Sequence, residues 1–219
     1  MIYRFPIVAL LALIISQGVS AQTHNIKVNE ERQEVIVNIV YEEKQKVEPN
    51  HFYLKTNLVG IGMLIANVAA EYEFGKYWSV NLPIYYSGWN YFRSSWKYRT
   101  FAVQPELRFH PSVKKCFFIG AHAGLAYFNY ALGGDYRYQD YNQDTPAIGG
   151  GLNIGYKLPF GENNRWGVEF SVGGGVYATK YDKYRNVNNG ELLETGLKKT
   201  FIGVDNAAIS ITYRFDINK

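Results

Sequence analysis

Apolar and polar residues alternate along most of this chain with a period of two residues. From Phe52 onward, the alternating segments are separated by clusters of Gly, Asn, Pro and Asp. A period of two is typical of β-strands, because successive side chains of a strand point to opposite faces, whereas a helix repeats every 3.6 residues. The pattern predicts eight strands, at about residues 52–59, 65–74, 78–87, 99–109, 116–129, 147–158, 166–178 and 201–216.

Each predicted strand has one apolar face and one polar face. In the third strand the apolar face carries Trp78, Val80 and Leu82. The polar faces carry many glycines, together with four cationic residues, four carboxylates and one histidine. These charged or titratable residues are Lys55, Glu71, Glu73, Glu106, Arg108, His122, Lys157, Glu169 and Arg214. The balance of charge predicts a network of ion pairs on one side of the sheet.

Alternation alone does not decide which face is enclosed. A soluble barrel encloses its apolar face, and a membrane barrel turns that face to the lipid. Aromatic residues gather near the ends of the apolar faces, as at Phe74, Trp78 and Phe109, which is typical of the two interfaces of a membrane. The predicted connections also alternate between short (75–77, 110–115, 159–165) and long (88–98, 130–146, 179–200). Both features favour an all-β fold, an eight-stranded antiparallel transmembrane β-barrel with periplasmic termini.

The expected interior of this barrel is filled. Eight strands leave an interior just wide enough for side chains, so we expect no permanent pore. Glycines on the polar faces would make room for larger neighbours such as Arg108, Phe118 and His122.

The chain begins with features of an exported protein. Arg4 precedes an apolar run over residues 5–15, and Val19-Ser20-Ala21 has the small-residue pattern of a signal-peptidase site. The run is too short for a membrane-spanning helix, so residues 1–21 are interpreted as a removed signal peptide. Residues 22–50 are charge-rich around one alternating run that begins at Val35. They are expected to be a periplasmic segment, either an extra strand, a docking tail or a disordered stretch, before the barrel of residues 51–219.

Composition and charge argue against nucleic-acid binding. The chain contains 19 Tyr, 13 Phe and 4 Trp and has a formal net charge of +4. The basic residues are scattered among carboxylates, so nucleic-acid binding is not indicated. The single cysteine, Cys116, cannot form an internal disulfide and is interpreted as a small apolar residue at a strand start.

His122 is the most tempting candidate for chemistry. It shares the polar side of the sheet with Glu106 and Glu169, and a histidine with a carboxylate can act as an acid–base pair. A hydrolase or acyltransferase also needs a nucleophile beside the histidine. Because His122 lies between Ala121 and Ala123, it is expected to be a buried member of the network, and no enzymatic activity is expected.

The sequence predicts no cofactor and no metal site. Glu71 and Glu73 could hold a cation together with Glu106, but no Asp-rich loop with the spacing of a hard-cation site is present. Pairing of these carboxylates with Lys55 and Arg108 is the favoured interpretation.

The long connections are the best place for a binding function. Tyrosine combined with small polar residues gives adaptable contact area at modest entropic cost. The candidate residues are Tyr136, Tyr138, Tyr141, Tyr181 and Tyr184. The alternative is that these tyrosines continue the strands beyond the membrane and form its aromatic girdle.

Several motifs, taken in order, resemble a known family. They are Leu54-Lys55-Thr56-Asn57-Leu58, Gly75-Lys76-Tyr77-Trp78-Ser79, Gln104-Pro105-Glu106-Leu107-Arg108, Gly120-Ala121-His122-Ala123-Gly124, Tyr181-Asp182-Lys183-Tyr184 and the ending 207–215. Together, over about residues 52–216, they resemble the uncharacterised family known as domain of unknown function 3575. The resemblance implies an exported outer-membrane β-barrel of a Gram-negative bacterium. It implies no established activity, ligand or catalytic residue.

The expected role is structural or interactive. The barrel would sit in outer-membrane lipid and present its external loops to a surface or periplasmic protein partner. Two alternatives stay open: a secreted lipocalin-like carrier with an apolar interior, and a lipid-modifying enzyme of the outer membrane.

Overall fold

The computed structural model describes residues 50–93, 95–112 and 114–216. They belong to one compact unit, residues 47–219. The predicted signal peptide, residues 1–21, lies outside the described residues, and so does the predicted periplasmic segment except for its last residue, Asn50.

The described residues are almost entirely β-strand. The elements are β1 (His51–Asn57), α3 (Leu58–Gly62), β2 (Ala66–Phe74), β3 (Trp78–Ser87), β4 (Trp96–Val103), β5 (Glu106–Phe109), β6 (Phe117–Leu132), β7 (Tyr136–Asp140), β8 (Ala147–Phe160), η2 (Glu162–Asn164), β9 (Trp166–Arg185) and β10 (Leu192–Asp216). In these ranges no helix has the length and apolar character needed to cross a membrane.

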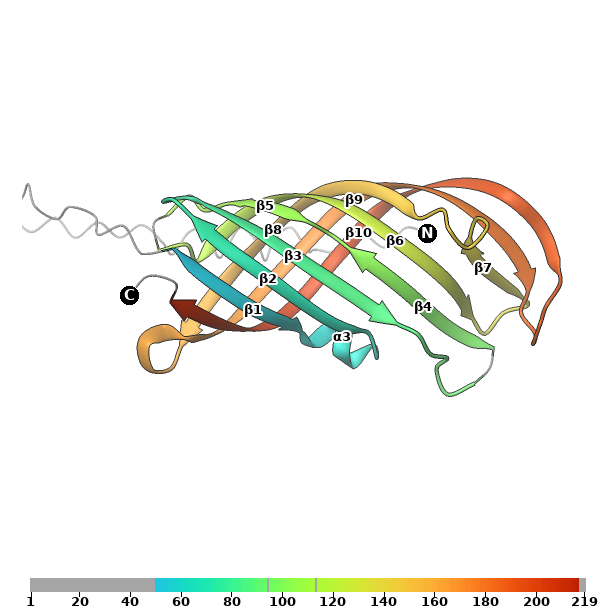
Figure 1. The fold of residues 1–219 in the computed structure, drawn as a ribbon, viewed down its shortest axis with the longest axis horizontal. Coiled ribbons are helices and arrows are strands. Elements are labelled where there is room, and N and C mark those ends of the chain that lie inside the picture. Colours follow the sequence, from blue (N-terminus) through green and yellow to red (C-terminus); the bar gives the residue numbers. More distant parts are fainter. Residues whose placement is uncertain (1–49, 94, 113, 217–219) are drawn as a thin grey trace, which may run out of the picture. The chain divides into compact units, whose positions relative to one another are not determined.

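The strands form one antiparallel sheet that closes into a barrel-like ring (Figure 1). The last strand, β10, closes the ring because it pairs with both β9 and β1. His51 at the start of β1 is opposite Asp216 at the end of β10. The chain therefore enters and leaves the ring at the same end, which also holds the short connections after β2, β5 and β8.

The structure has ten strands in its described part, where the sequence predicts eight. The predicted strand 99–109 is divided into β4 and β5, both of which lie between β3 and β6. The break falls at Gln104-Pro105, because proline lacks the N–H that continues a strand ladder. The other additional strand is β7, which forms inside the predicted loop 130–146 and lies between β6 and β9.

One of the predicted long loops is largely strand. β9 continues to Arg185 and β10 begins at Leu192, so the predicted loop 179–200 shrinks to six residues, 186–191. The wall of the ring is consequently uneven: β1 has 7 residues and β2 has 9, whereas β9 has 20 and β10 has 25. On the side of the short strands, α3 connects β1 to β2. Its N-cap residue is Asn57, whose Oδ1 accepts a hydrogen bond of 3.0 Å from the Val59 N–H.

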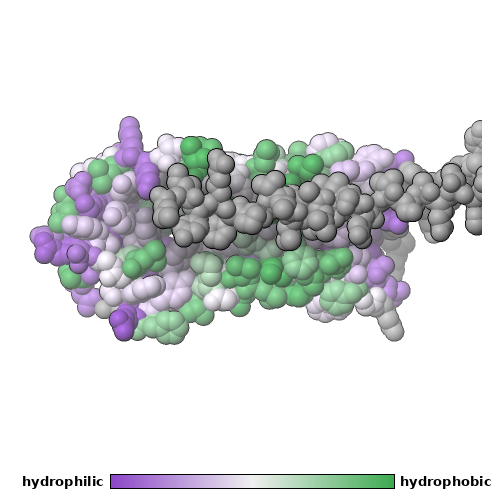
Figure 2. Space-filling model, turned by 180° about the vertical axis from the view of Figure 1, so that it is seen from behind, coloured by the Kyte–Doolittle hydropathy of each residue, from purple (hydrophilic) through white to green (hydrophobic). Residues whose placement is uncertain are grey.

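The ring is apolar outside and polar inside. Val80, Ile119 and Ile209 are 44%, 45% and 41% exposed, whereas Glu71 and Arg108 are 0% and 2% exposed. Figure 2 shows hydrophobic side chains gathered over the middle of the visible wall, with hydrophilic side chains toward its ends. The alternation of the strands therefore encloses the charged face.

Phe118 is the one large apolar side chain that is fully buried among the described residues. The Arg108 guanidinium lies over this ring, with Arg108 Cζ 3.9 Å from the centroid of the Phe118 ring. Space for the ring comes from Gly155, where a Cβ would clash with the tip of Phe118 and lie 2.6 Å from the Phe170 carbonyl oxygen. This glycine makes room for a larger neighbour, as the sequence predicts.

Replacing Gly155 with alanine is expected to destabilise the ring. The added methyl group would meet a buried ring and a sheet carbonyl that cannot both move away, and such overpacking costs about 1–3 kcal/mol. The free energy of unfolding in urea measures the effect. Gly62→Ala is the matched control, because nothing lies within 4 Å of its added Cβ. Equal stabilities of the two variants would contradict the close packing at Gly155.

Candidate functional site

The interior of the ring is occupied by an ion-pair network built around Glu71. This carboxylate, on β2, contacts Lys55 of β1, lies 3.1 Å from Arg108 Nη1 of β5, and lies 2.7 Å from Lys157 Nζ of β8. All of these side chains are buried. Four strands are thus joined through a single carboxylate at the centre of the ring.

Two further carboxylates complete the contacts of Lys55 and Arg108. Glu169 of β9 lies 2.6 Å from Lys55 Nζ and 2.9 Å from Arg108 Nη1. Glu106 of β5 lies 2.7 Å from Arg108 Nη2, and it also accepts hydrogen bonds from the amides of Asn81 and Asn153 at 3.0 and 2.9 Å. Lys55 thus contacts two carboxylates, and Arg108 contacts three.

The fourth carboxylate, Glu73, has a partner that the sequence analysis missed. Lys157 Nζ and Lys115 Nζ each lie 3.4 Å from a Glu73 oxygen. Lys115 lies in the predicted connection 110–115, but it is 5% exposed, and its backbone is left-handed (φ 51°). The signal that the sequence offers is the position of Lys115 directly before the alternating run 116–129.

Arg214, the remaining predicted cation, lies at the end of the ring. Its Nη2 donates to the Asn163 carbonyl at 2.7 Å, and it lines a cavity at the short-turn end. We refer below to Lys55, Glu71, Glu73, Glu106, Arg108, Lys115, Lys157 and Glu169 as the interior network. Its four cations and four carboxylates balance in charge.

Glu71, Glu73 and His110 are close enough together to be considered as a metal site. One ligand atom of each lies within 4.8 Å of the others. The two carboxylates are, however, already in contact with lysine ammonium groups, and Ser79 links His110 Nε2 (2.9 Å) to Glu71 (2.6 Å). A divalent cation would have to displace Lys157 and Lys115, so this arrangement fits the ion-pair network better than a metal centre.

His122 is bound to a carboxylate other than the expected ones. Glu106 is directly opposite His122 in the sheet, but its oxygens are taken by Arg108, Asn81 and Asn153. His122 Nε2 instead lies 2.7 Å from Asp205 Oδ2 of β10. His122 is buried, as expected, but its partner is Asp205 rather than a carboxylate of the predicted network. Asp205 escaped the sequence analysis because a β-bulge shifts the alternation of β10 between Val204 and Asn206.

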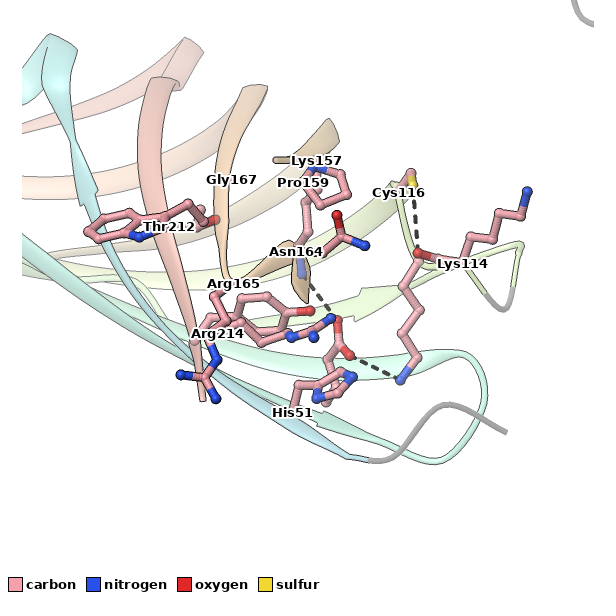
Figure 3. Close-up of a pocket in the computed structure, with 14 residues that line it drawn as sticks. His51, Lys114, Cys116, Lys157, Pro159, Asn164, Arg165, Gly167, Thr212 and Arg214 are labelled. Atoms are coloured by element: carbon pink, nitrogen blue, oxygen red, sulfur yellow. Dashed lines mark hydrogen bonds and ion pairs between the residues drawn. The ribbon is translucent and has the colours of Figure 1, made fainter. Parts of the chain in front are cut away.

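A cavity lies beside the interior network, at the end of the ring that holds the short connections after β2, β5 and β8 (Figure 3). We call it the inner cavity; its volume is about 360 Å³. His51 of β1, Lys157 of β8 and Arg214 of β10 line it, and Cys116 lies at its edge with a hydrogen bond of 3.6 Å to the Lys114 carbonyl. Glu71 and its partners separate this cavity from the other end of the ring.

A second cavity, the outer cavity, opens at the opposite end and has a volume of about 440 Å³. Val59 and Met63 from the α3 turn border it on the low side of the wall. Tyr85, Tyr98 and Tyr177 bring three aromatic rings to it. Asp205 is the one charged residue among its described lining residues.

Four of the five candidate tyrosines belong to strands of the tall wall, the part of the ring formed by β7, the end of β9 and the beginning of β10. Tyr136 and Tyr138 are in β7, and Tyr181 and Tyr184 are in β9. Tyr141 follows β7 and forms an isolated bridge with Thr145. This outcome matches the alternative in which the tyrosines continue the strands.

Aromatic and cationic contacts hold these tyrosines in place. The Tyr138 and Tyr181 rings meet edge to face with centroids 5.8 Å apart. Three cations lie over the other rings: Lys183 Nζ 4.2 Å from the Tyr136 centroid, Lys180 Nζ 3.3 Å from that of Tyr141, and Arg137 Cζ 4.4 Å from that of Tyr184. The tall wall is therefore an ordered surface.

Asp182 ties β9 to the turns around it. Its carboxylate accepts hydrogen bonds from Gly196 N–H (2.9 Å), the Thr195 hydroxyl (2.7 Å) and Asn142 N–H (3.2 Å). Burial raises the pKa of this carboxyl, but the three donors outweigh burial and lower the pKa below its ordinary value. Asp182 therefore stabilises the tall wall at neutral pH, and this contribution is lost as the pH falls through the lowered pKa.

Comparison with known proteins finds one family. The model of the family described as "Protein of unknown function (DUF3575)" matches residues 34–215. The match begins before the barrel and covers part of the predicted periplasmic segment 22–50, which contains none of the motifs given above. No curated protein and no solved structure matches the chain.

Replacing Glu71 with glutamine is expected to lower the stability of the ring by about 3–5 kcal/mol, because the change leaves buried cations without their shared anion. Unfolding in guanidinium measures the loss. Glu194→Gln is the control, since the pair of Glu194 with Lys183 lies at the surface and such pairs contribute less than about 1 kcal/mol. A loss for Glu71→Gln no larger than that of the control would mean that the network does not hold the ring together.

Proposed function

The chain belongs to the DUF3575 family, and we propose that it is a non-enzymatic β-barrel of the outer membrane of a Gram-negative bacterium. Its filled polar interior would support an external surface that interacts with other molecules. The observation that carries the proposal is the inversion of the faces, with apolar side chains outside and paired charges inside.

The energetics of the two faces support a lipid environment. Large apolar side chains such as Leu152 (65% exposed) and Ile202 (76% exposed) cover the outside of the ring. Soluble monomers rarely expose apolar patches larger than a few hundred Å², and a continuous apolar band is what a membrane barrel presents to lipid. The buried charges of the interior network are paired, as a water-poor interior requires.

Eight membrane crossings account for the ten strands. β4 and β5 occupy one position in the ring, between β3 and β6. β8 and β7 occupy another, between β6 and β9, with β7 continuing β8 beyond the apolar band. Each pair of strands would then be one crossing, and an even number brings both ends of the barrel chain to the periplasmic side.

The same geometry favours a structural role over transport or catalysis. The interior network lies between the inner and outer cavities and spans the ring from β1 to β9, so an open water path would require several buried ion pairs to break. The described residues that line the outer cavity, near His122, include no serine or cysteine that could act as a nucleophile.

The tall wall is the proposed interaction surface. Tyr136, Tyr141 and Tyr184 are held by cation–π contacts rather than by the barrel interior, so their outer edges stay available at low entropic cost. A surface or periplasmic protein is the expected partner. Cross-linking in cells with the wall intact or shortened between residues 133 and 146 would identify proteins that depend on it.

Cell fractionation separates this proposal from a secreted lipocalin-like carrier. The chain is expected in the outer-membrane fraction and should be released by detergent but not by salt or alkaline washing. A soluble carrier would enclose apolar residues, in contrast to the paired charges around Glu71. Recovery of the chain in the soluble periplasmic or secreted fraction would contradict the membrane location.

A charged substitution on the outer face gives a sharper test. Leu152→Arg is expected to lower stability in lipid vesicles by about 2–4 kcal/mol, because arginine near the bilayer midplane is costly. Phe92→Arg is the control: Phe92 is 98% exposed in the connection between β3 and β4, where arginine should change stability by less than about 0.5 kcal/mol. If the outer face meets water, Leu152→Arg will be as neutral as the control.

A further inference from the structure

The outer face of the ring changes from apolar to cationic along β9 and β10. Ile202 of β10 is opposite Val176 of β9, and these side chains are 76% and 50% exposed. Four residues farther along the pairing, Lys198 of β10 is opposite Lys180 of β9. Side chains separated by an even number of residues share one face of a strand. The two lysines therefore lie on the outside of the ring, directly beyond its apolar part.

A groove lies at this boundary, and we call it the lysine groove. Its volume is about 440 Å³. Lys180, Lys198 and Lys199 line it together with two apolar residues, Pro146 and Ile148. Ile148 is 59% exposed at the start of β8, on the apolar outside. The groove thus joins a concentrated positive charge to an apolar surface.

The positive charge of the groove is not neutralised by the described part of the chain. Lys180 and Lys198 are like charges directly opposite each other, an arrangement that destabilises a sheet. No carboxylate of the described residues forms an ion pair with the three lysines. Asp182 is near enough to feel the charge of Lys180, but three hydrogen-bond donors already hold its oxygens. An external anion would relieve the repulsion.

A ligand can reach both lysines. Lys198 is exposed and Lys180 is partly exposed. The Lys180 ammonium lies 3.3 Å from the centroid of the Tyr141 ring, which attracts the cation without cancelling its charge. A lysine ammonium carries three N–H donors, so this ring contact leaves donors for an anion.

The level of the groove along the ring matches that of lipid head groups. This step rests on the membrane location proposed above. A strand needs about 9–11 residues to cross the hydrocarbon layer, and the stretch of β9 from Trp166 to Val176 has this length. Lys180 would then lie just beyond the hydrocarbon, where the charged groups of lipids are.

We propose that the lysine groove binds the phosphate group of an anionic lipid, with Lys180 and Lys198 as its donors. The acyl chains of this lipid lie along the apolar outside next to the groove, against Ile148, Val176 and Ile202. Hydrogen bonds between an ammonium group and a phosphate are stronger than neutral ones. Lipid recognition of this kind needs both the charge and the apolar surface.

Three probes separate these two requirements. Native mass spectrometry of the purified full chain in a non-ionic detergent is expected to show saturable binding of dioctanoyl phosphatidic acid. Dioctanoyl phosphatidylcholine has the same acyl chains but no net charge, and inorganic phosphate has no acyl chain, so each should compete at least about tenfold more weakly. Equal competition by phosphatidylcholine would mean a merely apolar groove, and equal competition by inorganic phosphate would mean a site for free phosphate; either result overturns the proposal.

Variants locate the binding. Lys180→Gln combined with Lys198→Gln should weaken the binding of dioctanoyl phosphatidic acid by about tenfold or more. Lys76→Gln combined with Lys114→Gln is the control, because it changes the net charge equally at exposed positions of the opposite end of the ring, and it should leave binding unchanged. If the first double variant does not fold, Lys198→Gln alone tests the groove, since this side chain is exposed, and about a fivefold loss is expected.

The outcomes also separate this proposal from the membrane location. Absence of saturable binding, unchanged binding in the groove variants that fold, or an equal loss in the control would overturn the lipid site. A chain found in the outer-membrane fraction with any of these results would lose the lipid site alone. Recovery of the chain in a soluble fraction would overturn the membrane location whatever the lipid titration gives.

Discussion

Charge neutralisation inside a closed ring is the constraint on which the rest of this structure depends. Glu71 holds three cations from three other strands, and Glu169 holds two of the same three. Buried charges destabilise a protein strongly when one partner is missing, although a complete pair adds little net stability. The network therefore acts mainly on specificity: a strand that slipped by one residue would carry its charge to the apolar outer face.

The alternation of the sequence was sufficient to predict the faces and most strand positions. β3 matches its predicted range of 78–87, and the four glutamates expected inside the ring are enclosed. The pattern failed where side chains are outside the apolar band. Beyond Ala178 both faces of β9 are polar or aromatic, so the extension to Arg185 leaves no period of two between hydrophobic and polar residues. The strand break at Pro105 was readable from the proline itself.

The candidate site was predictable only where strands are regular. Lys115 enters the network from a turn with left-handed backbone, and Asp205 enters through a bulge. Neither position obeys the parity from which the interior was inferred. The bulge also explains why His122 and Glu106, which are opposite each other, do not pair: Arg108 and two asparagines saturate Glu106, and Asp205 supplies a carboxylate nearer to the outer mouth. One ring thus contains a neutral ionic centre and a separate acidic pocket.

The uneven wall also determines how copies of this protein can meet. Within the described residues, β1 pairs with β10 only over 210–216, while β10 begins at Leu192. The earlier part of β10 therefore has a free backbone edge, which is a template for unwanted sheet growth between molecules. Lys198 and Lys199 place charge on this edge, and the register shifts between Leu192 and Leu197 bend it. These two devices oppose fibre-like stacking, while β10 stays long enough to pair with β9, the strand that carries Tyr181 and Tyr184.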